Sequence, residues 1–96
     1  MMTFFLFGTY SPESIAKISL KRTEQLVNEI KDLGGKVTAM HVLLGEYDLL
    51  LCVHLPSIDD AVKASVNLTR LTGISFKTYP AVTVEQFDKL AVPGVP

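Results

Sequence analysis

Two apolar runs meet in the stretch LGEYDLLLCVH, residues 44–54. The first run covers residues 37–44 and the second covers residues 47–55. A two-residue loop with glycine in its first position is typical of a type II′ turn, because glycine adopts positive φ without a steric cost. The pattern therefore predicts a β-hairpin whose two strands are joined by Gly45 and Glu46.

The register of this hairpin gives its strands two different faces. It places His41 opposite Leu50 and Ala39 opposite Cys52, and side chains alternate between the faces along each strand. A one-residue slip would exchange the faces. One face is almost entirely apolar and is expected under helices; it holds Thr38, Met40, Val42, Leu44, Tyr47, Leu49, Leu51 and Val53. The other face mixes apolar and polar groups, which favours a surface covered by another subunit with a polar pocket in it; it holds Ala39, His41, Leu43, Asp48, Leu50, Cys52 and His54.

The rest of the chain supplies two more strands and two main helices. Ser19 and Ser57 stand in cap positions before helical patterns, and glycines at 34, 35 and 73 end those patterns. Pro80 places the last strand at an edge, because proline cannot donate a ladder hydrogen bond. The expected elements are strands at 3–9, 36–44, 47–55 and 74–82, main helices at 20–33 and 58–72, and helical turns at 12–18 and 84–90.

The order β-α-β-β-α-β predicts an α+β, ferredoxin-like domain with a four-stranded antiparallel sheet. Right-handed crossovers place both main helices on one face of that sheet. The face without helices remains apolar, which indicates an interface. We therefore expect a homodimer of the dimeric α/β-barrel type, or a larger ring. Residues 1–91 are expected to form one domain, with Phe87 and Leu90 docking the last helical turn, and residues 92–96 a flexible tail.

Composition narrows the partners and the compartment. The net charge is −1 with scattered basic residues, which argues against nucleic acid as a partner. No apolar run approaches the roughly 20 residues of a membrane span, so no membrane partner is expected. The apolar start lacks the features of a signal peptide, and we expect a cytoplasmic protein. The single cysteine, Cys52, excludes an internal disulfide. No phosphate loop or dinucleotide motif occurs, and we expect no cofactor.

Two family resemblances lie in the hairpin. The motif Gly45-Glu46-Tyr47-Asp48, followed by three leucines, resembles that of the GYD-domain family of small stand-alone proteins, and the flanking Lys21-Arg22, Gly34-Gly35-Lys36, Pro56 and Asp59 extend the match. The run 41–50 also resembles the ligand-binding domain of leucine-responsive (Lrp/AsnC-type) regulators. That resemblance implies dimers or rings that bind a small effector, usually an amino acid, near this turn between subunits. It also implies a stand-alone version, without the helix-turn-helix of a regulator.

The candidate ligand-binding residues are His41, Gly45, Tyr47 and Asp48. Asp48 lies diagonally across the hairpin from His41, where their side chains could meet. Such a pair is either an oriented general base or a plain hydrogen-bonded pair; alternatively, the Asp48 carboxylate binds turn amides. Tyr47 is expected to pack at the end of the helix-side face.

Other polar residues give weaker signals. His41 and His54 lie roughly 13 Å apart along the hairpin, so one chain cannot supply a metal site there. Cys52 is interpreted as an inert packed thiol, and no catalytic residue is assigned. Lys21 and Arg22 open a helix against its dipole, which indicates either a bound anion or solvated surface charges.

Three functions fit these patterns. The first is a small homo-oligomeric module that binds and senses a small metabolite at a subunit interface. The alternative is a small cofactor-independent enzyme, monooxygenase-like or isomerase-like, with a cleft between the helices and the sheet. The third is a purely structural subunit whose polar groups satisfy one another.

Overall fold

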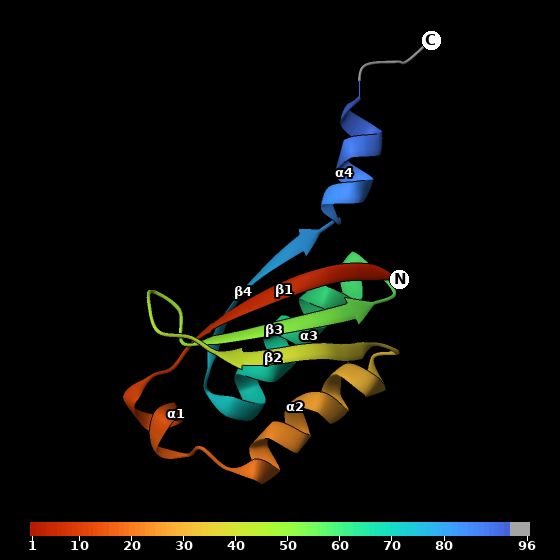
Figure 1. Ribbon diagram of the computed structural model, residues 1–96. Coiled ribbons are helices and arrows are strands. Elements are labelled where there is room, and N and C mark those ends of the chain that lie inside the picture. The colour runs from red at the N-terminus through yellow and green to blue at the C-terminus, as the bar shows by residue number, and fades with distance from the viewer. Residues whose placement is uncertain (93–96) are drawn as a thin grey trace.

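The computed structural model describes residues 1–92. In chain order the elements are β1 (Met2–Thr9), α1 (Pro12–Ala16), α2 (Leu20–Asp32), β2 (Lys36–Val42), β3 (Leu49–Leu55), α3 (Ile58–Thr72), β4 (Ser75–Ala81) and α4 (Val84–Ala91). The strands form one antiparallel sheet in the order β2-β3-β1-β4 (Figure 1). The predicted α+β, ferredoxin-like fold is confirmed, with β1 and β3 in the centre. The predicted tail 92–96 lies, apart from Val92, outside the described residues.

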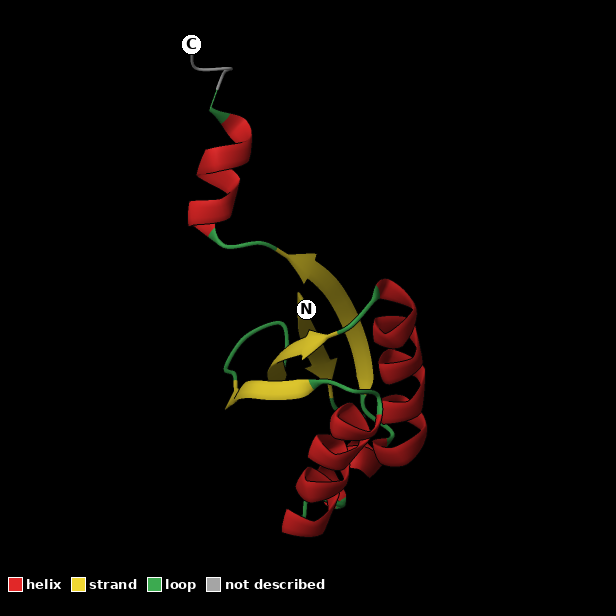
Figure 2. Cartoon of the chain, turned by 90° about the vertical axis from the view of Figure 1, so that its right-hand side faces the viewer, coloured by secondary structure: helices red, strands yellow, loops and turns green. Residues whose placement is uncertain are grey.

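The two main helices cover one side of the sheet (Figure 2). We call the side of the sheet toward α2 and α3 the helix face and the opposite side the open face. The helix face is apolar because alternate strand residues turn toward the helices. Its contacts form the core of the domain, which consists of Phe4, Leu6, Leu26, Ile30, Leu49, Leu51, Val53, Leu55, Ala61, Ala64, Leu68 and Ile74.

The helix boundaries follow the predicted caps. The Ser19 hydroxyl accepts a hydrogen bond from the Arg22 amide at 3.0 Å, and the Ser57 hydroxyl accepts one from the Asp60 amide at 3.2 Å. Gly73 ends α3 in the left-handed conformation, with φ of 73°. Side-chain oxygens at the N-cap and glycine at the C-cap satisfy helix-end groups that would otherwise lack partners. The capping predictions are confirmed.

The hairpin register is as predicted, but the turn is not. His41 pairs with Leu50 and Ala39 pairs with Cys52. However, β2 ends at Val42 and β3 begins at Leu49, so a loop of residues 43–48 replaces the two-residue turn. Positive φ occurs only at Gly34 and Gly73 among the glycines of residues 1–92, so the type II′ turn at Gly45 is wrong.

Two backbone hydrogen bonds of Asp48 fix the end of the loop. The Asp48 amide donates to the Gly8 carbonyl at 2.9 Å, while the Leu43 amide donates to the Asp48 carbonyl at 2.8 Å. The bond from Leu43 to Asp48 therefore closes a longer loop, and the Asp48 amide bonds to β1 instead of to β2. A β-bulge between Val37 and Ala39 adds a second irregularity. Thr38, which was expected on the helix face, lies at this bulge, and its hydroxyl donates to the Cys52 carbonyl at 3.0 Å.

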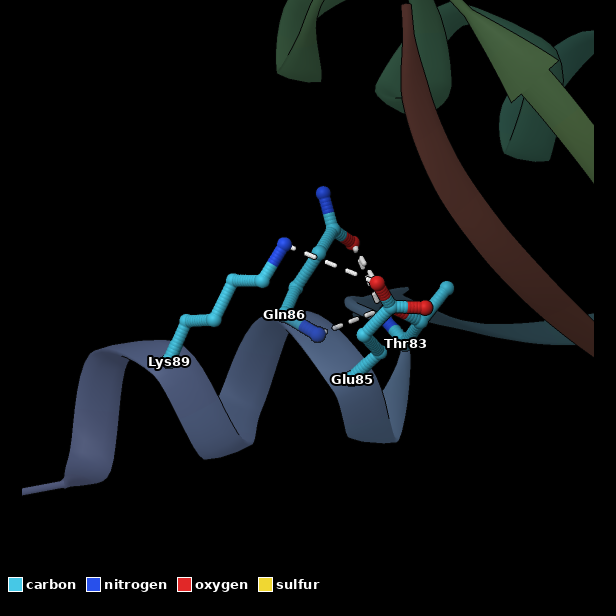
Figure 3. Close-up of polar contacts among 4 residues, drawn as sticks. All are labelled: Thr83, Glu85, Gln86 and Lys89. Carbon is cyan, nitrogen blue, oxygen red and sulfur yellow. Dashed lines mark hydrogen bonds and ion pairs between the residues drawn. The ribbon is translucent and has the colours of Figure 1, made fainter.

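Helix α4 extends away from the sheet instead of docking on it (Figures 1 and 2). Phe87 and Leu90 are 57% and 78% exposed, so their predicted docking onto the domain is wrong. The radius of gyration is 15.1 Å, against about 12–13 Å for a compact chain of this length. The helix is nevertheless well capped, since Thr83 and Gln86 form a reciprocal capping box beside a Glu85–Lys89 ion pair at 3.5 Å (Figure 3).

Candidate ligand-binding site

The loop 43–48 carries three of the four predicted site residues and projects from one end of the sheet (Figure 1). Leu44 is fully exposed, and a Cβ built on Gly45 would meet nothing within 4 Å. The backbone around Gly45 is therefore open to an approaching molecule. The apolar side chain of Leu44 is thus presented outward.

Asp48 anchors the loop to the turn after β1. Its carboxylate Oδ2 accepts a hydrogen bond from the Tyr10 amide at 2.9 Å. No hydrogen bond joins Asp48 to His41 in residues 1–92; of the arrangements considered from the sequence, the bond to a turn amide is the one found. The amide belongs to the turn that follows β1, a partner that hairpin reasoning alone could not identify. Asp48 thus ties β3 to β1 at the end of the sheet.

Tyr47 lies on the open face, not on the helix face as predicted. Its ring packs against that of Phe7, with centroids 4.9 Å apart, and Phe7 also contacts Tyr79 edge-on at 5.7 Å. We call Phe7, Tyr47 and Tyr79 the aromatic cluster. The prediction failed because the strand begins only at Leu49, so Tyr47 does not continue its alternation. Neither Phe7 nor Tyr79 stood out in the sequence as a site residue.

The aromatic cluster also carries polar groups. The pKa of the Tyr47 phenol lies above its ordinary value, first because of hydrogen bonding with the side chain of Tyr79 and then because of desolvation. The Lys77 Nζ lies 5.8 Å from the centroid of the Tyr47 ring and acts in the opposite direction. Tyr47 is therefore a neutral phenol at physiological pH, suited to hydrogen bonding and ring contacts and unsuited to act as a base.

His41 lies apart from the other three candidates. It sits on the edge strand β2 and is exposed, and its side chain has no hydrogen bond in the part of the chain described. It contributes to the rim of a cleft between the α1–α2 segment and the sheet. The structure therefore brings Tyr47 and Asp48 together at the loop, leaves Gly45 at its tip and places His41 at a second surface.

The centre of the open face is apolar. Phe5, Leu50 and Cys52 lie there half-buried on neighbouring central strands, and a hydrogen bond of 3.2 Å joins Thr3 to His54 at one end. Burial raises the pKa of the Cys52 thiol, which lowers the thiolate fraction at neutral pH. This agrees with the interpretation of Cys52 as a packed thiol.

The cleft at His41 lies between helices and sheet, where the enzyme alternative expected one, but most of its lining residues were not predicted. Its volume is about 290 Å³, and its wall includes Tyr10, Arg22 and Leu26. The only sequence signal was the unfavourable position of Arg22 in the first turn of a helix. Tyr10 gave none.

In residues 1–92 no three His, Cys, Asp or Glu side chains are close enough to hold a metal ion. None of the helices in that range has the length and apolar character needed to cross a membrane.

Comparison with known proteins identifies the family. The model of the GYD domain matches residues 4–91, which is nearly the whole chain. The chain belongs to the GYD-domain family. The sequence finds no match among curated proteins.

The structure of this GYD domain is similar to the crystal structure of the leucine response regulatory protein from Mycobacterium tuberculosis. The TM-score is 0.62 at 11% sequence identity, and the match covers 86% of this chain and 51% of that one. The GYD chain thus spans about half the length of that regulator. At this identity the similarity shows the shared fold alone.

Proposed function

We propose that this GYD-domain protein is a small homo-oligomeric module that binds a small metabolite at the interface between its subunits. The observation that carries the proposal is the open face of the sheet. It is apolar, no element of residues 1–92 covers it, and the GYD motif lies at its end with Tyr47 folded onto it. An apolar face of this kind in a small domain is characteristic of an interaction surface.

Helix α4 supports self-association independently of the open face. Isolated helices much shorter than about 12–15 residues are marginal in water, and most helices in proteins are stabilised by packing of an apolar face. The apolar residues of α4, Val84, Phe87 and Leu90, are all more than half exposed. A second copy of the chain would supply the surface that this helix requires.

Two subunits joined through their open faces would enclose the aromatic cluster near the loop 43–48. In that arrangement Tyr47 supplies a ring and a hydroxyl, and Gly45 supplies open backbone amide and carbonyl groups. Asp48 fixes the loop through the Tyr10 amide, and His41 on the edge strand completes the candidate set. A small polar metabolite with an apolar part fits such a site, and the resemblance to leucine-responsive regulators makes amino acids the first class to test.

The test is a thermal-shift screen of the purified protein against amino acids and other small metabolites. A ligand at 100 times its dissociation constant stabilises the protein by about 2.7 kcal/mol, which is readily measured in a small domain. Tyr47→Ala should remove most of that shift, whereas Leu44→Ala, at the exposed tip of the same loop, should retain it. A panel without any shift, or a shift that survives Tyr47→Ala, would contradict this proposal.

The second candidate is a cofactor-independent enzyme, monooxygenase-like or isomerase-like, and the apolar cleft at His41 favours it. Its weakness is that the Asp48 carboxylate is engaged by the Tyr10 amide and does not orient His41. A histidine without an orienting partner is a poor general base. Substrate turnover abolished by His41→Ala, with the fold retained, would favour the enzyme over the binding module.

A further inference from the structure

A single chain contains a cleft on the helix side of the sheet, which shares His41 with the proposed interface site but none of the loop residues 43–48. It lies between the α1–α2 segment and strands β2 and β3, and its volume is about 290 Å³. Its inner wall is formed by the buried side chains of Leu26, Leu49 and Ile74, while Ile15 and Ile18 stand half-exposed or more at its mouth. The cleft is thus predominantly apolar.

One charged side chain is buried in this apolar wall. Arg22 is only 9% exposed, its Nη1 donates a hydrogen bond to the Ser14 carbonyl, and its guanidinium carbon lies 5.6 Å from the centroid of the Tyr10 ring. No carboxylate pairs with it in residues 1–92, where the ion pair found is Glu85–Lys89. A buried arginine normally has a counter-charge, because desolvating an unpaired charge is costly.

The guanidinium still has donors to offer. A single hydrogen bond engages Nη1, while an arginine has further N–H groups on its other nitrogens. No fully buried side-chain nitrogen in residues 1–92 lacks a partner, so the other nitrogens of Arg22 reach accessible space. Because Arg22 lines the cleft, these donors are available to a molecule bound there.

The backbone adds to the positive character of this end of the cleft. Arg22 lies in the first turn of α2, and that turn contains no acidic residue. The N-terminal end of a helix carries partial positive charge, which favours an anion nearby. The buried guanidinium and the N-terminal end of α2 therefore both favour an anion in the cleft. The first turn of α2 contains no acidic side chain that would offset their positive charge.

The geometry points to a binding site for a small organic anion, with its carboxylate on Arg22 and its apolar body in the cleft. Arginine binds carboxylates well because its planar fork matches their two oxygens. Since a water molecule occupies about 30 Å³ in the liquid, the cleft holds roughly ten non-hydrogen atoms. This site lies within one subunit. Binding there does not require a second subunit, so its test is separate from the test of the proposed interface site.

The probe is octanoate, a carboxylate of the right size, used below its micelle concentration and measured by calorimetry and by amide chemical shifts. The neutral control is 1-octanol, which has the same chain without the charge. Arg22→Met removes the guanidinium and keeps an apolar stem. The matched control is Lys21→Met, which removes one positive charge from the same helix turn at an exposed position outside the cleft. Val42→Trp, at the exposed rim, narrows the cleft without touching Arg22.

Octanoate should bind at least about tenfold more tightly than octanol, with the largest shifts at Tyr10 and Arg22. Arg22→Met should abolish that preference, Val42→Trp should weaken both probes, and Lys21→Met should change octanoate affinity less than about twofold. Should Arg22→Met fail to fold, the octanoate–octanol ratio in the natural protein and the Val42→Trp result decide the matter. Equal affinity for the two probes, equal loss in both methionine variants, or no octanoate binding would overturn the assignment.

Discussion

Both faces of the central strands carry large apolar side chains, but the two faces meet different surroundings. On β3, Leu51 and Val53 face α2 and α3 and are fully buried, while Leu50 and Cys52, their immediate neighbours, remain half-buried on the open face. Apolar residues recur on both faces, yet the helices within residues 1–92 cover only one of them. This difference is the basis of the proposal that a second subunit covers the open face.

The largest difference between the faces should appear on truncating a leucine on the helix face. Leu51→Ala should lower the free energy of unfolding by about 2–5 kcal/mol, because it leaves a cavity in a close-packed core. Urea denaturation followed by circular dichroism measures this. Leu44→Ala, at a fully exposed position, should change stability by less than about 0.5 kcal/mol. Similar losses in both variants would remove the distinction between core and surface.

A second test probes the contact between the end of α2 and β3. A Cβ on Gly35 would lie 2.4 Å from the His54 carbonyl oxygen and 2.6 Å from a methyl carbon of Leu55. Gly35→Ala should therefore cost about 1–3 kcal/mol, as overpacking does. Gly45→Ala is the matched control, because no atom lies within 4 Å of its added methyl group. A harmless Gly35→Ala would show that helix and strand are less closely packed there.

A smaller effect is expected where the loop joins β1. Asp48→Ala removes the acceptor of the Tyr10 amide and should cost about 1 kcal/mol in a half-buried position. Glu46→Ala, an exposed acidic residue in the same loop, should leave the unfolding free energy unchanged within about 0.5 kcal/mol. If both variants behave alike, the carboxylate of Asp48 does not anchor the loop.

The smallest effect concerns the chemistry of the open face. Because burial raises the pKa of the Cys52 thiol, its thiolate fraction at pH 8 is below that of a free cysteine, and its reaction with Ellman's reagent should be slower. The rate should rise with pH up to the raised pKa, and unfolding in guanidinium should restore the rate of a free thiol. Immediate reaction of the folded protein would mean that the open face is neither packed nor covered.

The sequence predicted what local patterns determine. Alternation and caps indicated the strands, the helices and the sheet order, and the register of His41 with Leu50 is confirmed. The turn type was wrong because the Leu43 amide bonds to the Asp48 carbonyl and closes a longer loop, while the Asp48 amide bonds to Gly8, a residue distant in sequence. The same contact ends the alternation before Tyr47, which explains why that side chain lies on the opposite face.

The candidate site was predictable only in part. The loop residues stood out through their motif, but their partners Phe7, Tyr79 and Tyr10 come from other strands and turns. Arg22 gave a local signal, its unfavourable place at a helix start, while its burial depends on the tertiary contact with the Ser14 carbonyl. Tertiary contacts of this kind leave no periodic pattern in the sequence from which they could be predicted.

Sedimentation equilibrium would show whether a second copy of the chain covers the open face, as we propose. The natural protein should have a mass of at least twice the 10.5 kDa of one chain. Leu50→Lys, which places a charge at the centre of the open face, should sediment as a single chain with an unchanged circular dichroism spectrum. A natural protein that sediments at 10.5 kDa over the whole concentration range would contradict the account.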